Sequence, residues 1–478
     1  MIEKRDQEIN SKVLIRSSFW YTASNFLTKS IAFITIPIFT RIMTKSQYAD
    51  FSVFASWQSI FLIICGIEIY STLNRARFDF ETEDKFNSYI TSCLVLSSIF
   101  TGVVFLIYII FPDFFNNLFL LDRKYIYLMF AYLFTQPAFQ MFQAKQRIEY
   151  KYKFSAGLSF SLIIISTIVA VYLVFSIKDQ LLGRIFGQFF PYILVGAVMY
   201  CYFVRKNHFL SVDAWKYALK IGLPLVFSFL GSQILLSSDR VVVQHLSTSE
   251  EVAWLVLATS AAHIILLFVQ SLNNAWAPWF YDKLKLNSHE EIKKTFSLYM
   301  WFIVFCTFCV LLIGPEIVKI LAGKGYSESI YVLPANMLCG VFTALTTQFV
   351  NIEIYYKKTH YAAILTFIVA VLNIIGDIIG VKLFGYQAAC YITVLCQLIL
   401  ISLHYVISRK MDISKILSLR ELLVWLSVSL FLIPLSLILY RTLVIRILFI
   451  LAFCIVVCLI LFFNRKKLLN VIHRFRNS

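Results

Sequence analysis

The dominant pattern in the chain is an alternation of long apolar stretches with short polar joints, from Ile15 to Phe463. A helix needs about 20 consecutive apolar residues to cross a bilayer, and each stretch has roughly that length. The pattern therefore predicts about fourteen membrane-spanning helices and leaves almost no chain for a soluble domain. The expected spans are residues 15–39, 50–71, 88–111, 124–144, 154–177, 181–204, 217–239, 252–278, 296–318, 328–352, 361–381, 386–408, 421–440 and 443–463.

The composition and the charge distribution support this interpretation. Hydrophobic residues make up 60% of the chain and charged residues only 14%, whereas soluble domains carry about 25% charged residues. Of the 43 Lys and Arg residues, 30 lie in or within four residues of the N-terminus, the even-numbered joints and the C-terminal tail. Cytoplasmic joints carry the excess of positive charge, so both termini are expected in the cytoplasm. The net charge of +17 is then explained without a nucleic-acid partner.

A weak internal repeat indicates how the predicted helices are grouped. Thr44 and Gln47 form a capping-box pattern, and Ser247 with Glu250 repeats it six spans later. An even offset keeps both copies in one orientation, which predicts an all-α membrane protein of two six-helix lobes in a parallel pseudo-two-fold repeat around a central cavity. The expected organisation is a cytoplasmic N-terminus (1–14), an N-lobe (15–204), a cytoplasmic linker (205–216), a C-lobe (217–408), two extra C-terminal helices (409–463) and a basic cytoplasmic tail (464–478).

Polar residues follow one face of the first span. Thr22, Asn25 and Lys29 are separated by steps of three and four, which place them on the same side of a helix. Polar groups are costly in hydrocarbon, so this side should face a protein interior or a wet passage. Interhelical hydrogen bonding is the alternative for the uncharged residues, and a structural ion pair is the alternative for Lys29. Because Lys29 lies near mid-span, it is the strongest candidate for substrate binding.

Further candidates for substrate binding lie in other spans. Arg41, Arg184 and Arg240 stand near outer span ends, and the guanidinium fork suits phosphate. Each of them also fits an interfacial anchor. Gln270 and Asn274 belong to a polar stripe in the eighth span, together with His263.

Coupling to an ion gradient requires groups that bind and release an ion within the membrane. A carboxyl or imidazole group in a low-dielectric site can do this. The candidates are Asp377, His263, Asp239, Glu68 and Glu353. Solvation at a helix end is the alternative for Glu68 and Glu353, and ordinary packing is the alternative for His263.

Motifs for catalysis are missing from the sequence. It has no nucleophile elbow, no metal-binding His motif and no phosphate loop, since Gly323-Lys-Gly325 is too short. The ten cysteines lie in apolar spans without the spacing of a metal site. We therefore expect a protein that is not an enzyme and has no catalytic residue, no cofactor and no metal centre.

Several segments of the chain form a recognisable set. They are Ile36-Pro-Ile-Phe-Thr-Arg41 with Tyr48, Leu223-Pro-Leu225, Asp239-Arg240, Glu250-Glu251, Asn274-Ala-Trp-Ala-Pro278, and Tyr356-Lys-Lys-Thr359 with Asn373 and Phe384-Gly385. Together these segments resemble the bacterial polysaccharide flippases of the O-antigen type, over about residues 15 to 410. Ala49, Gln387 and Ala253-Trp254 depart from the residues common in that family.

The resemblance implies the fold of the multidrug/oligosaccharidyl-lipid/polysaccharide (MOP) exporter superfamily. It also implies a substrate, an undecaprenyl-diphosphate-linked oligosaccharide of O-antigen, lipopolysaccharide or capsule synthesis, moved from the inner to the outer leaflet of the bacterial inner membrane. By the same resemblance, Lys29 and Arg240 would meet the diphosphate or acidic sugars. Membrane lipids, a polymerase and a chain-length regulator would be the other partners.

Two alternatives to a flippase stay open at this point. A multidrug or cation antiporter of the same fold would favour acidic residues in its cavity. A membrane enzyme of the same pathway, a polymerase or ligase, would need a long outer loop, and the joints of this chain are short.

Overall fold

The computed structural model describes residues 30–31, 33–80, 82–149, 151–206, 210–323, 325–411 and 416–463. All regular structure in these residues is helical. After a helical segment at Phe33–Ile42, the helices are α2 (Lys45–Gly66), α3 (Ile69–Asp79), α4 (Glu83–Ile110), α5 (Pro112–Phe119), α6 (Arg123–Ile148), α7 (Tyr152–Ser176), α8 (Gln180–Lys206), α9 (Val212–Leu246), α10 (Ser249–Lys285), α11 (His289–Leu312), α12 (Gly314–Leu321), α13 (Ser329–Tyr355), α14 (Thr359–Phe384), α15 (Gln387–Ser408), the short 3-10 helix η1 (Arg409–Met411), α17 (Leu419–Arg441) and α18 (Leu443–Phe463).

The protein is a multi-pass helical membrane protein. Within the described ranges, 11 helices are long and apolar enough to cross a membrane, counting α2 and α3 together. The expected fourth span, α6, is not among them, although it has 26 residues. Polar residues such as Gln136, Lys145 and Gln146 lower the mean hydropathy of α6. These three side chains are buried in the protein.

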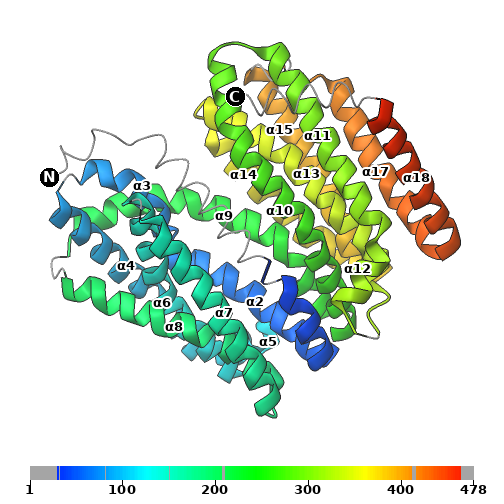
Figure 1. The fold of residues 1–478 in the computed structure, drawn as a ribbon. Helices are drawn as coiled ribbons and strands as arrows, with labels where there is room; N and C mark the ends of the chain where they lie inside the picture. The colour runs from blue at the N-terminus through cyan, green and yellow to red at the C-terminus, as the bar shows by residue number, and fades with distance from the viewer. Residues whose placement is uncertain are drawn as a thin grey trace.

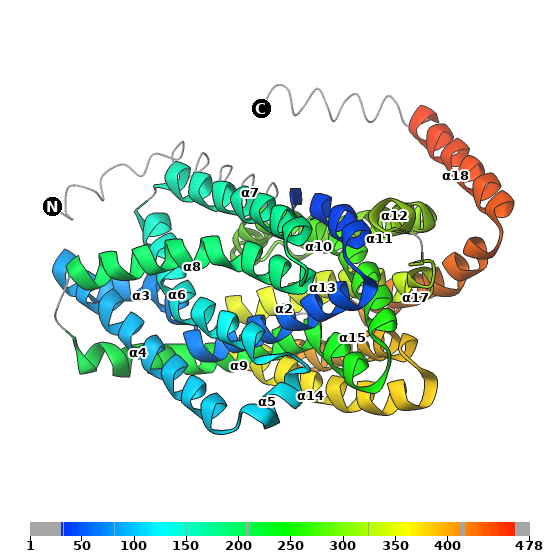
Figure 2. The same cartoon turned by 90° about the horizontal axis from the view of Figure 1, so that it is seen from below.

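The helices form two bundles. Helices α2–α8 contact one another in the first bundle, and α10–α15 with α17 do so in the second. The long helix α9 lies between them and contacts α2, α3 and α4 on one side and α14 on the other. Figure 1 shows that the bundles lie close together near the start of α2 and α12, whereas their opposite ends diverge. Figure 2 shows the same two groups from below, with α18 at the periphery.

The second expected span is interrupted. Helix α2 ends at Gly66, and α3 starts at Ile69 after Ile67 and Glu68, which both have positive φ (48° and 50°). At this level α9 passes close by, since a Cβ atom on Gly222 would lie 2.6 Å from the Ile67 carbonyl oxygen. The interruption faces protein, because Ser97 donates a 3.0 Å hydrogen bond to the Cys65 carbonyl.

The helix starts support part of the predicted repeat. Thr44 and Gln47 form the predicted capping box at the start of α2. The second box is displaced by one residue from the prediction, because Thr248 caps α10 and pairs with Glu251. Ser247 instead precedes the cap and donates to Glu251. The prediction was wrong in register here because Ser247 and Thr248 both carry a hydroxyl group suited to capping.

Candidate functional site

The two bundles are joined by polar contacts at their converging ends, defined here as the start of α2, the α9–α10 joint and α12. Thr40 donates a 2.7 Å hydrogen bond to the Leu321 carbonyl. The exposed Arg41 donates to the Ile320 carbonyl at 2.9 Å. Lys45 and Glu250 form a 3.2 Å ion pair. Arg41, a predicted binding residue, therefore tethers the ends in this state and does not point into a site.

A second contact at this level links α2 to the end of α9. Gln244 donates a 3.0 Å hydrogen bond to Asp50. The Tyr48 ring packs edge-on against Tyr326 of the α12–α13 joint, with centroids 6.4 Å apart. The converging ends are thus closed by several weak, separable contacts.

Just inside these contacts, Arg184 of α8 is buried, with 8% of its surface exposed. The carbon of its guanidinium lies 3.0 Å from the ring centre of Phe39 and 4.5 Å from that of Phe51. Its Nε and Nη1 atoms have no hydrogen-bond partner. A buried cation held mainly by aromatic faces is costly unless an anion reaches it at some stage of function.

Arg240 of α9 approaches the same region from the other side of α2. Its Nη1 donates a long 3.4 Å hydrogen bond to Ser52, and its Nε has no partner. The Tyr48 hydroxyl interacts electrostatically with both Arg184 and Arg240. Arg184 belongs to α8 of the first bundle and Arg240 to α9, which lies between the bundles. Both arginines contact α2, at Phe51 and Ser52 respectively, and they are called the basic pair below. The arrangement has the donors that a diphosphate or an acidic sugar would bind.

A separate acidic cluster lies between α9 and two helices of the second bundle, α14 and α15. It consists of Asp239 and Asp377 with three uncharged polar side chains, and all five are at most 8% exposed. Ser238 donates to the Asn373 Oδ1 atom at 2.8 Å, and Asn373 donates to Thr393 at 3.2 Å. Neither carboxylate oxygen of Asp377 has a hydrogen-bond partner, and Asp377 interacts electrostatically with Asp239.

The chemistry of the acidic cluster suits a small cation. Its oxygen atoms come from carboxylates, an amide and hydroxyl groups, which are ligands for hard cations and not for transition metals. Among the described residues, no group of three or more His, Cys, Asp or Glu side chains stands at metal-binding distance. Asp377 is 0% exposed, so an organic molecule cannot reach its carboxylate in this state.

The predicted polar stripe of α10 lies on an exposed face. His263, Gln270 and Asn274 are all exposed, although this part of α10 is a candidate membrane span. Helix α10 also contacts α2 of the first bundle. An exposed polar face inside a span is expected to meet water or substrate and not lipid. The structure therefore separates His263 from Asp239 and Asp377, which lie in the buried cluster.

The remaining predicted residues are placed elsewhere or not described. Glu68 is 5% exposed at the α2–α3 interruption, where its carboxylate accepts a 3.3 Å hydrogen bond from Ser71. Glu353 is fully buried near the end of α13 and contacts His404. The solvated alternative considered for these two residues is thus not what the structure shows. Lys29, Asn25 and Thr22 lie outside the described residues.

Several residues of these sites were not singled out from the sequence. Thr393 and Ser238 complete the acidic cluster, and Phe39 with Tyr48 completes the surroundings of the basic pair. For Thr393 a signal existed, because hydroxyl groups in an apolar span seek partners. Phe39 stands in a segment that resembles the family, but nothing in that segment indicated its contact with Arg184.

These features define a helical membrane protein with the fold of MOP superfamily transporters. The fold matches the lipid II flippase MurJ in an inward closed conformation, with a TM-score of 0.69 over 94% of this chain and 99% of that chain, at 16% identity. A family model described as "Polysaccharide biosynthesis protein" matches residues 14–284, and the chain belongs to this family. The family and the transporter fold that the sequence resemblance implied are thereby confirmed.

Two further relatives agree with this assignment. An inward-facing multidrug resistance transporter of the MATE family, also in the MOP superfamily, matches with a TM-score of 0.61 over 82% of this chain and 95% of that chain, at 14% identity. Protein 1 of the Lsg locus of Haemophilus influenzae is 21% identical over 357 residues, which are 72% of this chain and 86% of that protein. At these identities the solved structures establish the fold alone.

Proposed function

We propose that this protein is a flippase that carries an undecaprenyl-diphosphate-linked oligosaccharide from the inner to the outer leaflet of the bacterial inner membrane. The O-antigen or capsule repeat unit is the cargo. The observation that carries the proposal is the basic pair beside α2: Arg184 is buried, Arg240 is half-buried, and three of their guanidinium nitrogens have no hydrogen-bond partner. An anionic headgroup supplies the acceptors that these nitrogens lack.

The positive-inside rule orients the transport cycle. The converging ends belong to joints that are poor in Lys and Arg, so we place them on the outer side, with both termini in the cytoplasm. The bundles, acting as N-lobe and C-lobe, then diverge toward the cytoplasm and admit the headgroup there. Breaking the contacts of Lys45, Thr40 and Arg41 would open the outer side. Lys29, Asn25 and Thr22 extend the proposed cationic route along the first span.

The acidic cluster is the proposed site of the coupling ion. A cation such as Na⁺ bound by Asp239 and Asp377 would bridge α9 and α14, and α9 is the helix that also contacts the first bundle. This supports an ion-driven flippase over a multidrug antiporter. An organic cation would need an open acidic cavity, whereas Asp377 is 0% exposed.

The test is transport in proteoliposomes that contain the purified protein and a fluorescent undecaprenyl-diphosphate oligosaccharide. We expect the lipid to reach the outer leaflet faster than in protein-free vesicles, and a Na⁺ gradient to accelerate it. Cells that lack the gene should accumulate lipid-linked repeat units and lose surface polysaccharide. Unchanged surface polysaccharide without such accumulation, or export of cationic drugs in place of the lipid, would contradict the proposal.

A further inference from the structure

A surface groove follows the second half of helix α8, on a face that neither site described above uses. Its volume is about 680 Å³, which is within the range of ligand-binding pockets. Leu194, Val198 and Tyr202 line it and are 51%, 63% and 46% exposed. Arg205 and Lys206 line the last turn, where α8 ends. The groove is therefore apolar along most of its length and basic at one end.

The glycines of α8 explain why this face stays open. Gly187 brings the first half of α8 close to α7, since a Cβ atom there would lie 2.3 Å from the Ala170 Cα atom. Figure 1 shows α7 and α8 diverging from their joint toward the other end of α8. In the second half, Gly196 packs against α6. Residues two positions away point in nearly the opposite direction, so Leu194 and Val198 face outward.

The basic end of the groove has donors that are weakly engaged. In the part of the chain that the structure describes, Arg205 is exposed and has no ion-pair partner. Lys206 lies 4.0 Å from Glu83, and its side chain is 42% exposed. Its ammonium group is 5.9 Å from the centre of the Tyr202 ring, and Lys145 of α6 adds a further positive charge that acts on it. This end can therefore bind an anion without breaking a strong contact.

The dimensions of the groove match one leaflet of a bilayer. Leu194 and Lys206 are 12 positions apart, which is about 18 Å of helix. Half of the hydrocarbon core of a bilayer is about 15 Å thick. Because α8 is a candidate membrane span, the groove begins near the middle of the membrane and ends at headgroup depth. Tyr202, one turn before the end, lies where amphipathic aromatic residues are enriched.

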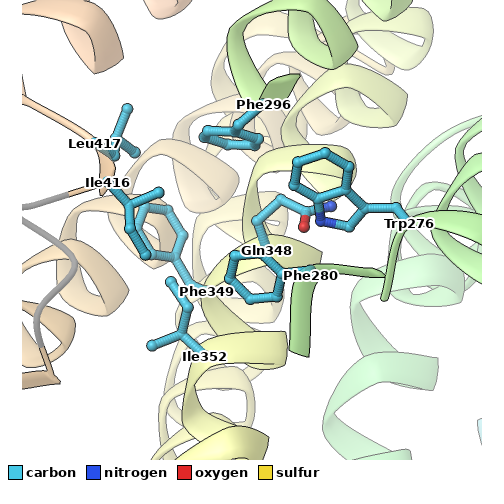
Figure 3. Close-up of a pocket in the computed structure, with 8 residues that line it drawn as sticks. All are labelled: Trp276, Phe280, Phe296, Gln348, Phe349, Ile352, Ile416 and Leu417. Carbon is cyan, nitrogen blue, oxygen red and sulfur yellow. The ribbon is translucent and has the colours of Figure 1, made fainter. Parts of the chain in front are cut away.

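A hollow inside the second bundle differs from the groove in size and in chemistry (Figure 3). The rings of Trp276, Phe280, Phe296 and Phe349 surround it. Its volume is about 10 Å³, and the surface that it exposes is apolar. This hollow is a gap in the packing of the core and has no room for a ligand. The groove of α8 combines the space for an acyl chain with cationic groups at one end.

We propose that the groove binds an anionic phospholipid, with one acyl chain along Leu194 and Val198 and the phosphate at Arg205 and Lys206. Guanidinium and ammonium groups donate charge-assisted hydrogen bonds to phosphate, and basic pockets at the cytoplasmic ends of helices suit anionic headgroups. The lipid belongs to the inner leaflet under the orientation proposed above, although its binding does not depend on that orientation.

The bound phospholipid is distinct from the proposed cargo. Arg205 is 21 positions from Arg184 of the basic pair, which is about 31 Å of helix. The groove is lined by α8 of the first bundle, whereas the basic pair lies beside α2. The lipid therefore remains on the protein surface while the cargo moves, and the inference goes beyond the proposed flippase function.

The experiment measures binding of fluorescent phosphatidylglycerol and phosphatidylcholine, with the same acyl chains, to the purified full-length protein in detergent. We expect the wild type to bind phosphatidylglycerol about 10- to 30-fold more tightly, since each Lys or Arg near an anionic lipid contributes about fivefold. The variant R205Q/K206Q should lose most of this preference. The variant V198W, which fills the apolar part of the groove and keeps the charges, should bind both lipids several-fold more weakly.

A matched control removes the same charge elsewhere on the first bundle and the adjoining start of α9. R75Q/K216Q replaces an arginine and a lysine with side chains that are 76% and 77% exposed, and it should keep the preference for phosphatidylglycerol. Glycerol phosphate, a headgroup without chains, should not displace the lipid. The proposal is overturned if R205Q/K206Q keeps the preference, if V198W binds as the wild type does, or if the control loses the preference equally.

Two competitors separate the lipid from other anions. Displacement of phosphatidylglycerol by glycerol phosphate at similar concentration would show a simple anion site and overturn the proposal. Displacement by undecaprenyl diphosphate at lower concentration would make the groove part of the cargo path and overturn it as well. No transport is measured, so failure here leaves the flippase test unaffected, and failure of the flippase test leaves this result unaffected.

Discussion

Asp239 and Arg240 are neighbours in the sequence, yet they belong to two buried sites of opposite charge. Successive residues of a helix point about 100° apart. Asp239 therefore faces α14 and the acidic cluster, while Arg240 faces α2 and donates to Ser52. One turn of α9 thus serves one site beside α2 and another beside α14 and α15.

The two sites differ in what surrounds the charge. The Arg184 guanidinium of the basic pair lies against the faces of two aromatic rings, Phe39 and Phe51, near the converging ends. The carboxylates of the acidic cluster lie among buried hydroxyl and amide groups of α9, α14 and α15, such as Asn373. Under the proposed function, the aromatic-lined basic pair would bind the large anionic headgroup, and the polar acidic cluster would bind the small cation.

The largest effect is expected from removing Arg184. We expect R184A to lower the transport rate by about 100-fold, because two charge-assisted hydrogen bonds to the headgroup would be lost. Protein abundance should change little, since a costly buried cation is removed as well. The measurement is the flipping rate in proteoliposomes per mole of protein. R75A, at an arginine with a 76% exposed side chain, is the control. A parallel loss of rate and abundance would make Arg184 structural.

A smaller but more specific effect is expected from D377N. Loss of this carboxylate should abolish acceleration by a Na⁺ gradient, a loss of about tenfold, and leave the affinity for the lipid substrate unchanged. Flipping rates measured with and without the gradient test this. D213N, at a carboxylate with a 93% exposed side chain, is the control. If D377N weakens substrate binding and R184A abolishes the Na⁺ effect, the assignment of the two sites is reversed.

Variants of the Lys45–Glu250 ion pair test how the converging ends of the two bundles are held together. K45E or E250K places like charges together, which should weaken closure of the converging ends by about 1 kcal/mol, or fivefold in the open population. Spin-label distances between α2 and α10 would report the shift. The double reversal K45E/E250K should restore the wild-type distances. Unchanged distances in the single variants would show that these ends are held by the Thr40 and Arg41 hydrogen bonds instead.

The smallest effect is expected at Asp179 in the α7–α8 joint. This carboxylate has hydrogen-bond donors, in contrast to Asp377 of the acidic cluster, and it serves as a comparison for that cluster. Burial alone would raise its pKa, but hydrogen bonds from Lys124, the Leu182 amide and Tyr125 outweigh it and hold the pKa below its usual value. A depressed pKa stabilises the fold above about pH 4, and this contribution is lost as the pH falls through the folded value. D179N should therefore unfold at a slightly lower temperature than wild type at pH 7, and the difference should shrink as the pH falls below about 4 in thermal scans.

The sequence was sufficient for the parts of the fold that local periodicity encodes. The apolar stretches predicted the helices, and the step of four from Asn373 to Asp377 placed both residues on one face, where the structure has them buried together. The capping residues Thr44 and Gln47 were found because a cap depends only on its own first turn.

Contacts between distant segments could not be predicted. Arg184 meets Phe39 across 145 positions of the chain, and nothing in either segment indicates the other. The His404 partner of Glu353 is hidden for the same reason. The interruption after Gly66 was missed because Ile67 and Glu68 are residues that normally avoid positive φ, so no local turn signal marks it.

That interruption has a consequence for the energetics of the transport cycle. A branched residue such as Ile67 at φ 48° is unfavourable, by an amount of order 1–3 kcal/mol. Helix α2 contacts the second bundle through α10, whereas α3 contacts α6 of the first. A rotation of α2 relative to α3 about Ile67 and Glu68 would relieve this backbone strain. The free energy released would offset part of the cost of separating the converging ends.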